Sequence, residues 1–223
     1  MHHIQIPWKD RASYLRITLA TLFEAARNYP GEFDITIYNN ESSESVPEIA
    51  LQDPRVRIVK LPVTNCHNNY YVMFEQMFNR YPPASHIINI DADAVIHPEF
   101  FFALDDMIRD CEDFGVLSLF NWDSHPEDTG RYKEKYIPRK HSSFFCAVVR
   151  REAWDMFTPP PPEGPWDYGC ADGHFTTFVH NSTPYKVYST LRSYMENIGF
   201  LGKHAGESDD GISNTVKARR FYP

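Results

Sequence analysis

The chain has 223 residues, of which 42% are hydrophobic and 23% are charged, a composition that fits one α/β domain with a sizeable core. Its net charge of −8 argues against nucleic acid as a partner. No apolar stretch is long enough for a transmembrane segment, and the first residues lack the pattern of a signal peptide, so we expect a cytoplasmic protein. The four cysteines form no C-x-x-C pair and predict no zinc site, and the sequence leaves the oligomeric state open.

The first half of the chain alternates between predicted strands and helices. Apolar residues recur at helical spacing after Ser13, which we expect to be the N-cap of the first helix. This order predicts an α/β fold with a mainly parallel, Rossmann-like central sheet flanked by helices. The expected strands cover 4–7, 33–38, 55–61 and 87–91, and the expected helices cover 13–28 and 69–81.

The second half continues the same single domain. Pro98 is expected to open a helix that ends at Asp110. The proline run 158–165 predicts a stiff polyproline II-like connection rather than a linker between domains. The polar segment 121–141 predicts a mobile loop, and strands are expected before it at 115–120 and after it at 142–150.

Two aspartates follow the fourth expected strand, in the sequence Asp91-Ala92-Asp93. In open α/β sheets, ligands bind beyond the carboxyl ends of the strands. Carboxylates this close repel each other, a divalent cation removes that repulsion, and oxygen ligands suit Mg²⁺ or Mn²⁺. The motif therefore predicts a metal site that a nucleotide diphosphate approaches past the small Ala92. The alternative is a solvated turn that contains two aspartates by coincidence.

A second motif lies between Trp166 and Phe175, where a glycine-rich turn precedes a segment with helical spacing. It places Asp172 at the start of that segment, a position that favours a carboxylate electrostatically. Asp172 is therefore either a helix N-cap or a general base that deprotonates an acceptor hydroxyl. Asp167 competes with it for the second role.

A third motif places His204 in a loop between Gly202 and Gly206. An imidazole there would complete a metal site with the aspartate pair, since it is an acceptable ligand for Mn²⁺. The alternative is a surface or structural histidine. The chain has no P-loop, no G-x-G-x-x-G after a strand and no G-x-S-x-G motif, which excludes simple P-loop, dinucleotide-binding and α/β-hydrolase functions.

Together these motifs resemble a GT-A glycosyltransferase of the family 2 type, over nearly the whole chain. The opening from Ile4 to Ala25, the Asp91-Ala92-Asp93 motif and the segment from Glu196 to Phe200 followed by Gly-x-His are similar to that family. Ala171-Asp172 falls where the family often has Glu-Asp, so Ala171 is a departure. Asn39 likewise stands where the family commonly has an aspartate that contacts the nucleoside.

The resemblance implies a role for several residues. Asp93 would bind Mn²⁺ or Mg²⁺, Asp91 would bind the metal or the ribose, and His204 would be a third ligand. Asp172, or else Asp167, would be the catalytic base. The nucleotide pocket of a UDP-sugar, the favoured donor, would be lined by Pro7, Asp10, Arg11, Asn39, Asn68, Asp91 and Ala92.

The resemblance also implies a reaction and a division of the domain. A sugar would pass from the nucleotide-sugar to a hydroxyl of a glycan acceptor by direct displacement, with inversion at the anomeric carbon. Residues 1–93 would bind the nucleotide-sugar, and residues 94–223 would bind the acceptor.

Two other functions remain open at this point. A phosphatase of the haloacid dehalogenase type also has D-x-D after a buried strand, with Asp91 as its nucleophile. A module that binds nucleotide-sugars without turnover is the second, because Ala171 replaces an acidic residue.

Overall fold

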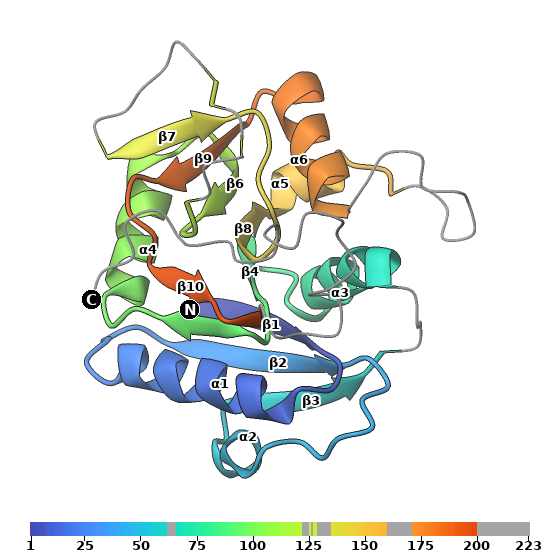
Figure 1. Ribbon diagram of the computed structural model, residues 1–223. Coiled ribbons are helices and arrows are strands. Elements are labelled where there is room, and N and C mark those ends of the chain that lie inside the picture. Colours follow the sequence, from blue (N-terminus) through green and yellow to red (C-terminus); the bar gives the residue numbers. More distant parts are fainter. Residues whose placement is uncertain (62–65, 122–124, 126, 129–134, 160–170, 200–223) are drawn as a thin grey trace, which may run out of the picture.

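The computed structural model describes residues 1–61, 66–121, 125, 127–128, 135–159 and 171–199, and of residues 66–68 only the helical backbone (Figure 1). The strands are β1 (His2–Trp8), β2 (Phe33–Asn39), β3 (Val56–Lys60), β4 (His86–Ile90), β5 (Ala94–Ile96), β6 (Phe114–Ser118), β7 (Tyr136–Arg139), β8 (Cys146–Arg150), β9 (Lys186–Thr190) and β10 (Met195–Asn197). The helices are α1 (Ala12–Ala26), α2 (Glu48–Gln52), α3 (Cys66–Arg80), α4 (Phe100–Asp110), α5 (Arg151–Asp155) and α6 (Ala171–Ser182).

The described residues form one mixed eight-stranded sheet in the order β3-β2-β1-β4-β8-β6-β9-β7. Neighbours from β3 to β4 are parallel, and β1, β2 and β3 are each followed by a helix. β8 lies antiparallel between β4 and β6, and β7 pairs antiparallel with β9 at the edge. Most strands therefore run in one direction, as predicted, and their carboxyl ends share one edge, where open α/β sheets bind ligands.

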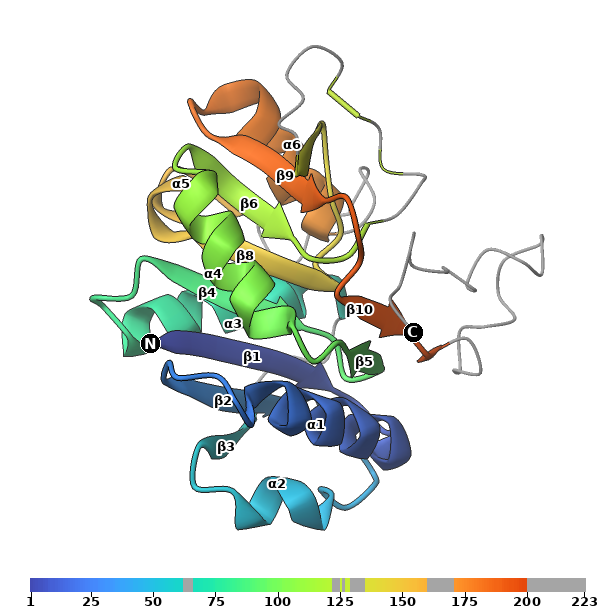
Figure 2. The ribbon, with the colours of Figure 1, turned by 90° about the vertical axis from the view of Figure 1, so that its left-hand side faces the viewer.

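Helices cover both faces of the sheet (Figures 1 and 2). α1 and α4 pack on one face, in a core that includes Phe101 and Ile88. α3, α5 and α6 pack on the other, in a core that includes Phe74 and Ile87. Side chains alternate between faces along a strand, so β4 contributes to both cores. None of the helices in the described part of the chain is long and apolar enough to cross a membrane.

A small antiparallel sheet of β5 and β10 lies beyond the end of β4. Asn197 pairs with Ala94, so a late segment of the chain returns to the turn that follows β4. Figure 2 shows this small sheet at the edge where the parallel strands end. The fold therefore brings residues 195–199 to the Asp91-Ala92-Asp93 motif.

The structure corrects three local predictions. Ser13 is not an N-cap, because α1 begins at Ala12 and its cap residue is Arg11 in the left-handed conformation. α4 begins at Phe100, two residues after the expected Pro98. The segment 121–141, predicted to be a loop, contains β7, which pairs with β9 and is buried.

Five short elements were not predicted at all, namely α2, α5, β5, β9 and β10. Each has five residues or fewer. A segment that short shows too few repeats for its hydrophobic period to be recognised. Their positions depend on the tertiary contacts around them.

Candidate active site

Asp91 and Asp93 lie at the carboxyl end of β4, in the middle of the sheet. Asp91 is the first residue after the strand, and its N–H still donates to the carbonyl oxygen of Phe145 at 3.1 Å. Asp93 directly precedes β5. The predicted position of the two carboxylates, after a buried central strand, therefore agrees with the structure.

The turn between the aspartates is held by α1. The buried hydroxyl of Thr18 lies 2.9 Å from the carbonyl oxygens of both Ala92 and Ala94, and it accepts a hydrogen bond from the N–H of Ala94 at 2.9 Å. Thr21, one turn later, accepts from the N–H of Ile96 at 3.1 Å. These side chains bind main-chain groups of Ala92, Ala94 and Ile96, so α1 fixes the shape of the turn and of β5.

Asp91 occupies a half-buried, polar environment. Its Oδ1 accepts hydrogen bonds from the Tyr70 hydroxyl at 2.9 Å and from Nδ2 of Asn89 at 3.0 Å. Burial, and then the charge of Asp93, raise the pKa of Asp91 well above its ordinary value, while these two hydrogen bonds lower it. Burial and the charge of Asp91 likewise raise the pKa of Tyr70, which keeps it a hydrogen-bond donor.

Asp93 is held from two other directions. Arg11 donates from Nη1 to its Oδ2 at 3.1 Å, and Ile198, just after β10, donates its N–H to the Asp93 carbonyl oxygen at 2.9 Å. A Cβ at Gly199 would lie 2.0 Å from Oδ2 of Asp93, so only glycine allows this approach. Burial raises the pKa of Asp93, and the guanidinium of Arg11 opposes that shift.

The loops after β1 and β2 are joined beside this site. Oδ1 of Asp10 accepts hydrogen bonds from the N–H and the hydroxyl of Ser43 at 2.8 and 2.9 Å. Glu44 accepts the N–H groups of Arg11 and Ala12 at 2.9 and 2.5 Å, at the start of α1. The bonds from Ser43 lower the pKa of Asp10.

The backbone of these two loops is strained at three non-glycine residues. Asp10, Arg11 and Glu41 have φ angles of 55°, 57° and 53°. Such angles are uncommon outside glycine and often occur at functional sites. Pro7, near the end of β1, and Asn39, the last residue of β2, lie at the same edge, where Oδ1 of Asn39 accepts from the N–H of Ser42 at 2.8 Å.

Asp172 lies in the first turn of α6, as predicted. Its Oδ1 accepts from the N–H of Gly173 at 2.7 Å, and its Oδ2 accepts from the N–H of Phe144 at 3.3 Å. Burial raises the pKa of Asp172, while these backbone bonds and the nearby His141 lower it. Asp172 also contributes to the raised pKa of Asp91, so the two carboxylates share one electrostatic environment.

Comparison with known proteins agrees with this arrangement. Residues 4–157, which include α1, the two aspartates and the segment around Phe144, match the model of the family described as glycosyl transferase family 2. The chain belongs to glycosyl transferase family 2. The match ends before α6, so Asp172 lies outside the matched part of this family 2 chain.

Solved structures share the fold of this family 2 chain, which is the expected GT-A fold. TarS 1–349 from S. aureus superposes with a TM-score of 0.60 at 15% identity, over 87% of this chain and 60% of that one. The mannosyltransferase PcManGT from Pyrobaculum calidifontis, solved with GDP-Man and Mn²⁺, gives a TM-score of 0.59 at 15% identity, over 91% and 58%. The chain therefore spans less than two thirds of either structure.

A third structure has a length closer to that of this chain. A197 from STIV gives a TM-score of 0.50 at 10% identity and covers 88% of this family 2 chain and 84% of its own. No curated protein matches the sequence.

The chemistry of the family 2 site fits a divalent cation. Asp91 and Asp93 bring two half-buried carboxylates together, and burial raises the pKa of both, so negative charge at this place is only partly offset by Arg11. The described residues hold no group of three or more potential ligands. That set suits Mg²⁺ or Mn²⁺, which bind through one or two carboxylates together with substrate phosphates, rather than zinc.

Three predicted site residues of the family 2 chain cannot be placed beside this pair. Asp167 and His204 lie outside the described residues. Asn68 belongs to the first turn of α3, and its side chain is likewise outside the described part. Their assigned roles stay predictions.

Several residues that shape the family 2 site escaped the sequence analysis. Tyr70, Asn89 and Thr18 contact the motif directly, although each lies in a segment recognised only as a strand or helix. For Asn89 a signal existed, because a lone amide interrupts the apolar run of β4. For Thr18 and Tyr70 the sequence contains no such signal, since both residue types are ordinary in helices next to a core.

A cavity of about 310 Å³ lies elsewhere in the domain, between α4 and the ends of β7 and β9. Tyr136, Thr190 and Tyr194 are among the residues that line it. None of the residues of the aspartate site lines this cavity, so it is separate from the candidate active site.

Proposed function

We propose that the chain is a metal-dependent glycosyltransferase that moves a sugar from a nucleotide diphosphate sugar to a hydroxyl of a glycan acceptor. The observation that carries the proposal is the position of Asp91 and Asp93 at the end of β4, with Asp172 joined to the same site through Phe144. Family 2 membership supports the same reaction class.

Asp93 and Asp91 would hold the cation. When bound, Mn²⁺ or Mg²⁺ supplies positive charge that offsets the charge of the departing nucleoside diphosphate. Around it, Arg11 brings a further positive charge, and Ala92 leaves room for the diphosphate because its side chain is small.

The nucleoside would bind at the ends of β1 and β2. Pro7, Asp10, Arg11 and Asn39 lie there, and the bonds between Asp10 and Ser43 fix the two loops relative to each other. Asn68, in the first turn of α3, would line the same pocket. We assign residues 1–93 to donor binding and residues 94–223 to acceptor binding.

Asp172 would accept the proton of the attacking acceptor hydroxyl. Its raised pKa makes it a stronger base than an ordinary aspartate, and the N–H groups of Gly173 and Phe144 hold the carboxylate in place. Direct attack by that hydroxyl on the anomeric carbon inverts its configuration. Asp167 is the alternative base.

Uridine is the favoured nucleotide. TarS has been solved with UDP-GlcNAc, which supports UDP, and PcManGT has been solved with GDP-Man and Mn²⁺, which supports a metal but another base. The match to family 2 favours transfer over phosphatase chemistry at Asp91.

The first test is a thermal-shift panel of UDP-, GDP- and dTDP-sugars, each with Mn²⁺ and with EDTA. A ligand that binds the folded state raises the melting temperature by mass action. We expect one nucleotide class to raise it with Mn²⁺ and to lose the effect in EDTA. No shift with any donor would contradict the proposal.

Asp93→Ala is the matched variant for this panel. It removes one proposed ligand together with the partner of Arg11, so the Mn²⁺-dependent shift is expected to disappear. An unchanged shift would exclude Asp93 as a ligand. An assay for release of the nucleoside diphosphate from the donor then distinguishes the two functions. An enzyme releases it, whereas a module that only binds nucleotide-sugars does not.

A further inference from the structure

Asn89 is a buried amide in the middle of the central sheet. It lies in β4 between Ile88 and Ile90, is 0% exposed, and points to the face that α3 covers. A buried amide is costly unless its donors and acceptor are paired. Each of its polar atoms has a partner in the structure, and two of those partners belong to the candidate active site.

The first connection is direct. Nδ2 of Asn89 donates one hydrogen bond to Oδ1 of Asp91 at 3.0 Å. The Tyr70 hydroxyl donates to the same oxygen at 2.9 Å, so two neutral donors fix the rotamer of this carboxylate. The other oxygen of Asp91 receives no hydrogen bond from the described residues.

The second connection passes through Phe144. Nδ2 of Asn89 donates its other hydrogen to the Phe144 carbonyl oxygen at 2.5 Å, and the N–H of Phe144 donates to Oδ2 of Asp172 at 3.3 Å. The main chain of Phe144 therefore connects the amide of Asn89 with the carboxylate of Asp172. It is held by one bond at its carbonyl oxygen and by another at its N–H.

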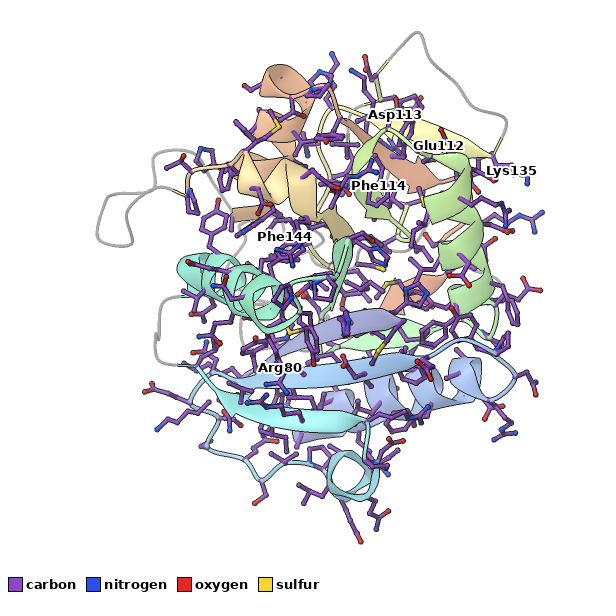
Figure 3. All side chains as sticks on the ribbon, turned by 180° about the vertical axis from the view of Figure 1, so that it is seen from behind. Arg80, Glu112, Asp113, Phe114, Lys135 and Phe144 are labelled. Carbon is purple, nitrogen blue, oxygen red and sulfur yellow. The ribbon has the colours of Figure 1, made fainter. Side chains whose placement is uncertain are left out.

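Phe144 is itself tightly packed. Its ring lies between α3 and α6, with ring centroids 5.4 Å from Tyr70, 5.1 Å from Phe74 and 6.0 Å from Phe175 (Figure 3). Its residue is 1% exposed. Because the ring is confined, a shift of its carbonyl oxygen is transmitted to its N–H rather than absorbed by the side chain.

We propose that Asn89 is a positioning residue that sets the relative placement of the metal-binding carboxylate Asp91 and the base Asp172. One amide nitrogen, with two hydrogens, is shared between the two halves of the site. This inference rests on the proposed function for the roles of the two carboxylates. The placement itself follows from the hydrogen bonds and can be tested without substrate.

Gln5 of β1 offers a matched control. Its Nε2 donates to Oδ1 of Asn89 at 3.2 Å, and its own Oε1 is buried without a partner among the described residues. It belongs to the same buried network, yet it contacts neither Asp91 nor Phe144 in the described structure. Gln5→Met therefore measures the general cost of disturbing the network.

Two variants test Asn89 itself. Asn89→Leu keeps the approximate volume and removes both donors. Asn89→Ser is milder and keeps the protein polar there, but a hydroxyl has one hydrogen and cannot serve both acceptors. Agreement between the two variants separates loss of positioning from loss of folding.

The first readout is amide hydrogen exchange of Phe144 in the protein without metal or nucleotide. We expect both Asn89 variants to speed this exchange about fivefold or more, the effect of losing one hydrogen bond. Gln5→Met is expected to leave it within about twofold once its effect on global stability is subtracted. Unchanged exchange in both Asn89 variants would overturn the proposal.

The second readout has two parts. Calorimetry measures the affinity of the protein for UDP and, separately, for GDP in the presence of Mn²⁺. The rate of turnover is measured as release of nucleoside diphosphate from UDP-glucose and from GDP-mannose. Asn89→Leu should weaken nucleotide binding and lower the rate at saturation, each about tenfold, because hydrogen bonds to both carboxylates are affected. In an Asp172→Asn background it should weaken binding but lower the rate no further. Equal rate losses in both backgrounds would overturn the link to Asp172.

Failure of the proposed function gives a different result. If the parent protein binds neither nucleotide, the assigned reaction is wrong, while the exchange of Phe144 still reports whether Asn89 controls its position. If the parent binds and turns over a donor but the Asn89 variants behave as Gln5→Met does, the function stands and the positioning role is excluded.

Discussion

Arg11 donates a hydrogen bond from Nη1 to Oδ2 of Asp93 at 3.1 Å, across 82 positions of the sequence. The pair is partly buried, with 30% of the Arg11 side chain and 19% of the Asp93 side chain exposed. The chain therefore supplies a cation of its own next to the two carboxylates. A metal ion bound to Asp93 has to share that carboxylate with the guanidinium.

Arg11→Met is predicted to strengthen the binding of Mn²⁺ alone, about two- to fivefold, because a nearby positive charge is removed from a partly exposed site. Binding of UDP without metal should weaken, since the same charge attracts the diphosphate. Titration of Mn²⁺ by electron paramagnetic resonance, with calorimetry for UDP, measures both. Arg16→Met, an exposed arginine of the same helix, is the control, and equal behaviour of the two variants would refute this view.

Asp172→Asn is predicted to retain Mn²⁺-dependent nucleotide binding and to lose transfer by about 10²–10⁴-fold, the usual worth of a general base. The amide keeps one oxygen, which can accept the shorter bond from the N–H of Gly173 while Phe144 loses its acceptor, so the start of α6 should survive. Calorimetry and transfer rates on the same preparation separate the two effects. Retained transfer would move the role of base to Asp167.

The pH dependence of transfer should follow the raised pKa of Asp172. The base acts only when ionised, so activity is present above this pKa and is lost as pH falls through it, at a higher pH than for an ordinary aspartate. Burial is the cause of the shift, and His141 opposes it. A profile of kcat whose acid limb lies at the ordinary aspartate value would contradict the assignment.

The raised pKa of Asp172 also predicts that the folded state loses stability as pH rises, whereas activity increases over the same change. The folded state binds the proton of Asp172 more tightly than the unfolded state, so stability is full below the unfolded pKa and declines as pH rises through the folded one. Asp172→Asn cannot ionise and should melt at a higher temperature than the parent near pH 7. The difference should vanish near pH 3, and melting curves at both pH values test it.

Gly199→Ala is predicted to weaken Mn²⁺-dependent nucleotide binding about 10–100-fold, the usual cost of disturbing a group that supports a metal ligand. The new Cβ would lie 2.0 Å from Oδ2 of Asp93, and a side-chain end moves more easily than backbone, so Asp93 should rotate while the fold persists. Gly173→Ala is the control for affinity, because its Cβ would meet nothing within 4 Å. Equal affinities of both variants would exclude this role for Gly199.

Thr18→Val is predicted to destabilise the domain by about 1–3 kcal/mol, the cost of leaving a buried polar group unpaired. Valine fills the same volume but leaves the N–H of Ala94 without its partner. Denaturant unfolding measures the loss. Thr177→Val, on the exposed side of α6, should change stability by less than about 0.5 kcal/mol.

Much of the fold was predictable because it depends on local patterns. The apolar periods of β1, α1, β2, α3 and β4 identify each element within a few residues, and their alternation implies a parallel sheet. The D-x-D motif follows from the same pattern, since polar residues after a buried strand lie at the ligand-binding edge. The elements missed were short, or, like β7, lay in a polar segment whose burial depends on its neighbours.

The sequence by itself determined the type of site: two carboxylates after a central strand, and an aspartate at the start of a late helix. Only the tertiary structure decided what surrounds them. β8 lies antiparallel between β4 and β6, which brings Phe144 beside Asn89, and β10 pairs with β5, which brings Gly199 against Asp93. Hydrophobic periodicity specifies which face of a strand is buried but not which strand is its neighbour, so contacts between such distant residues follow from sheet order and register alone.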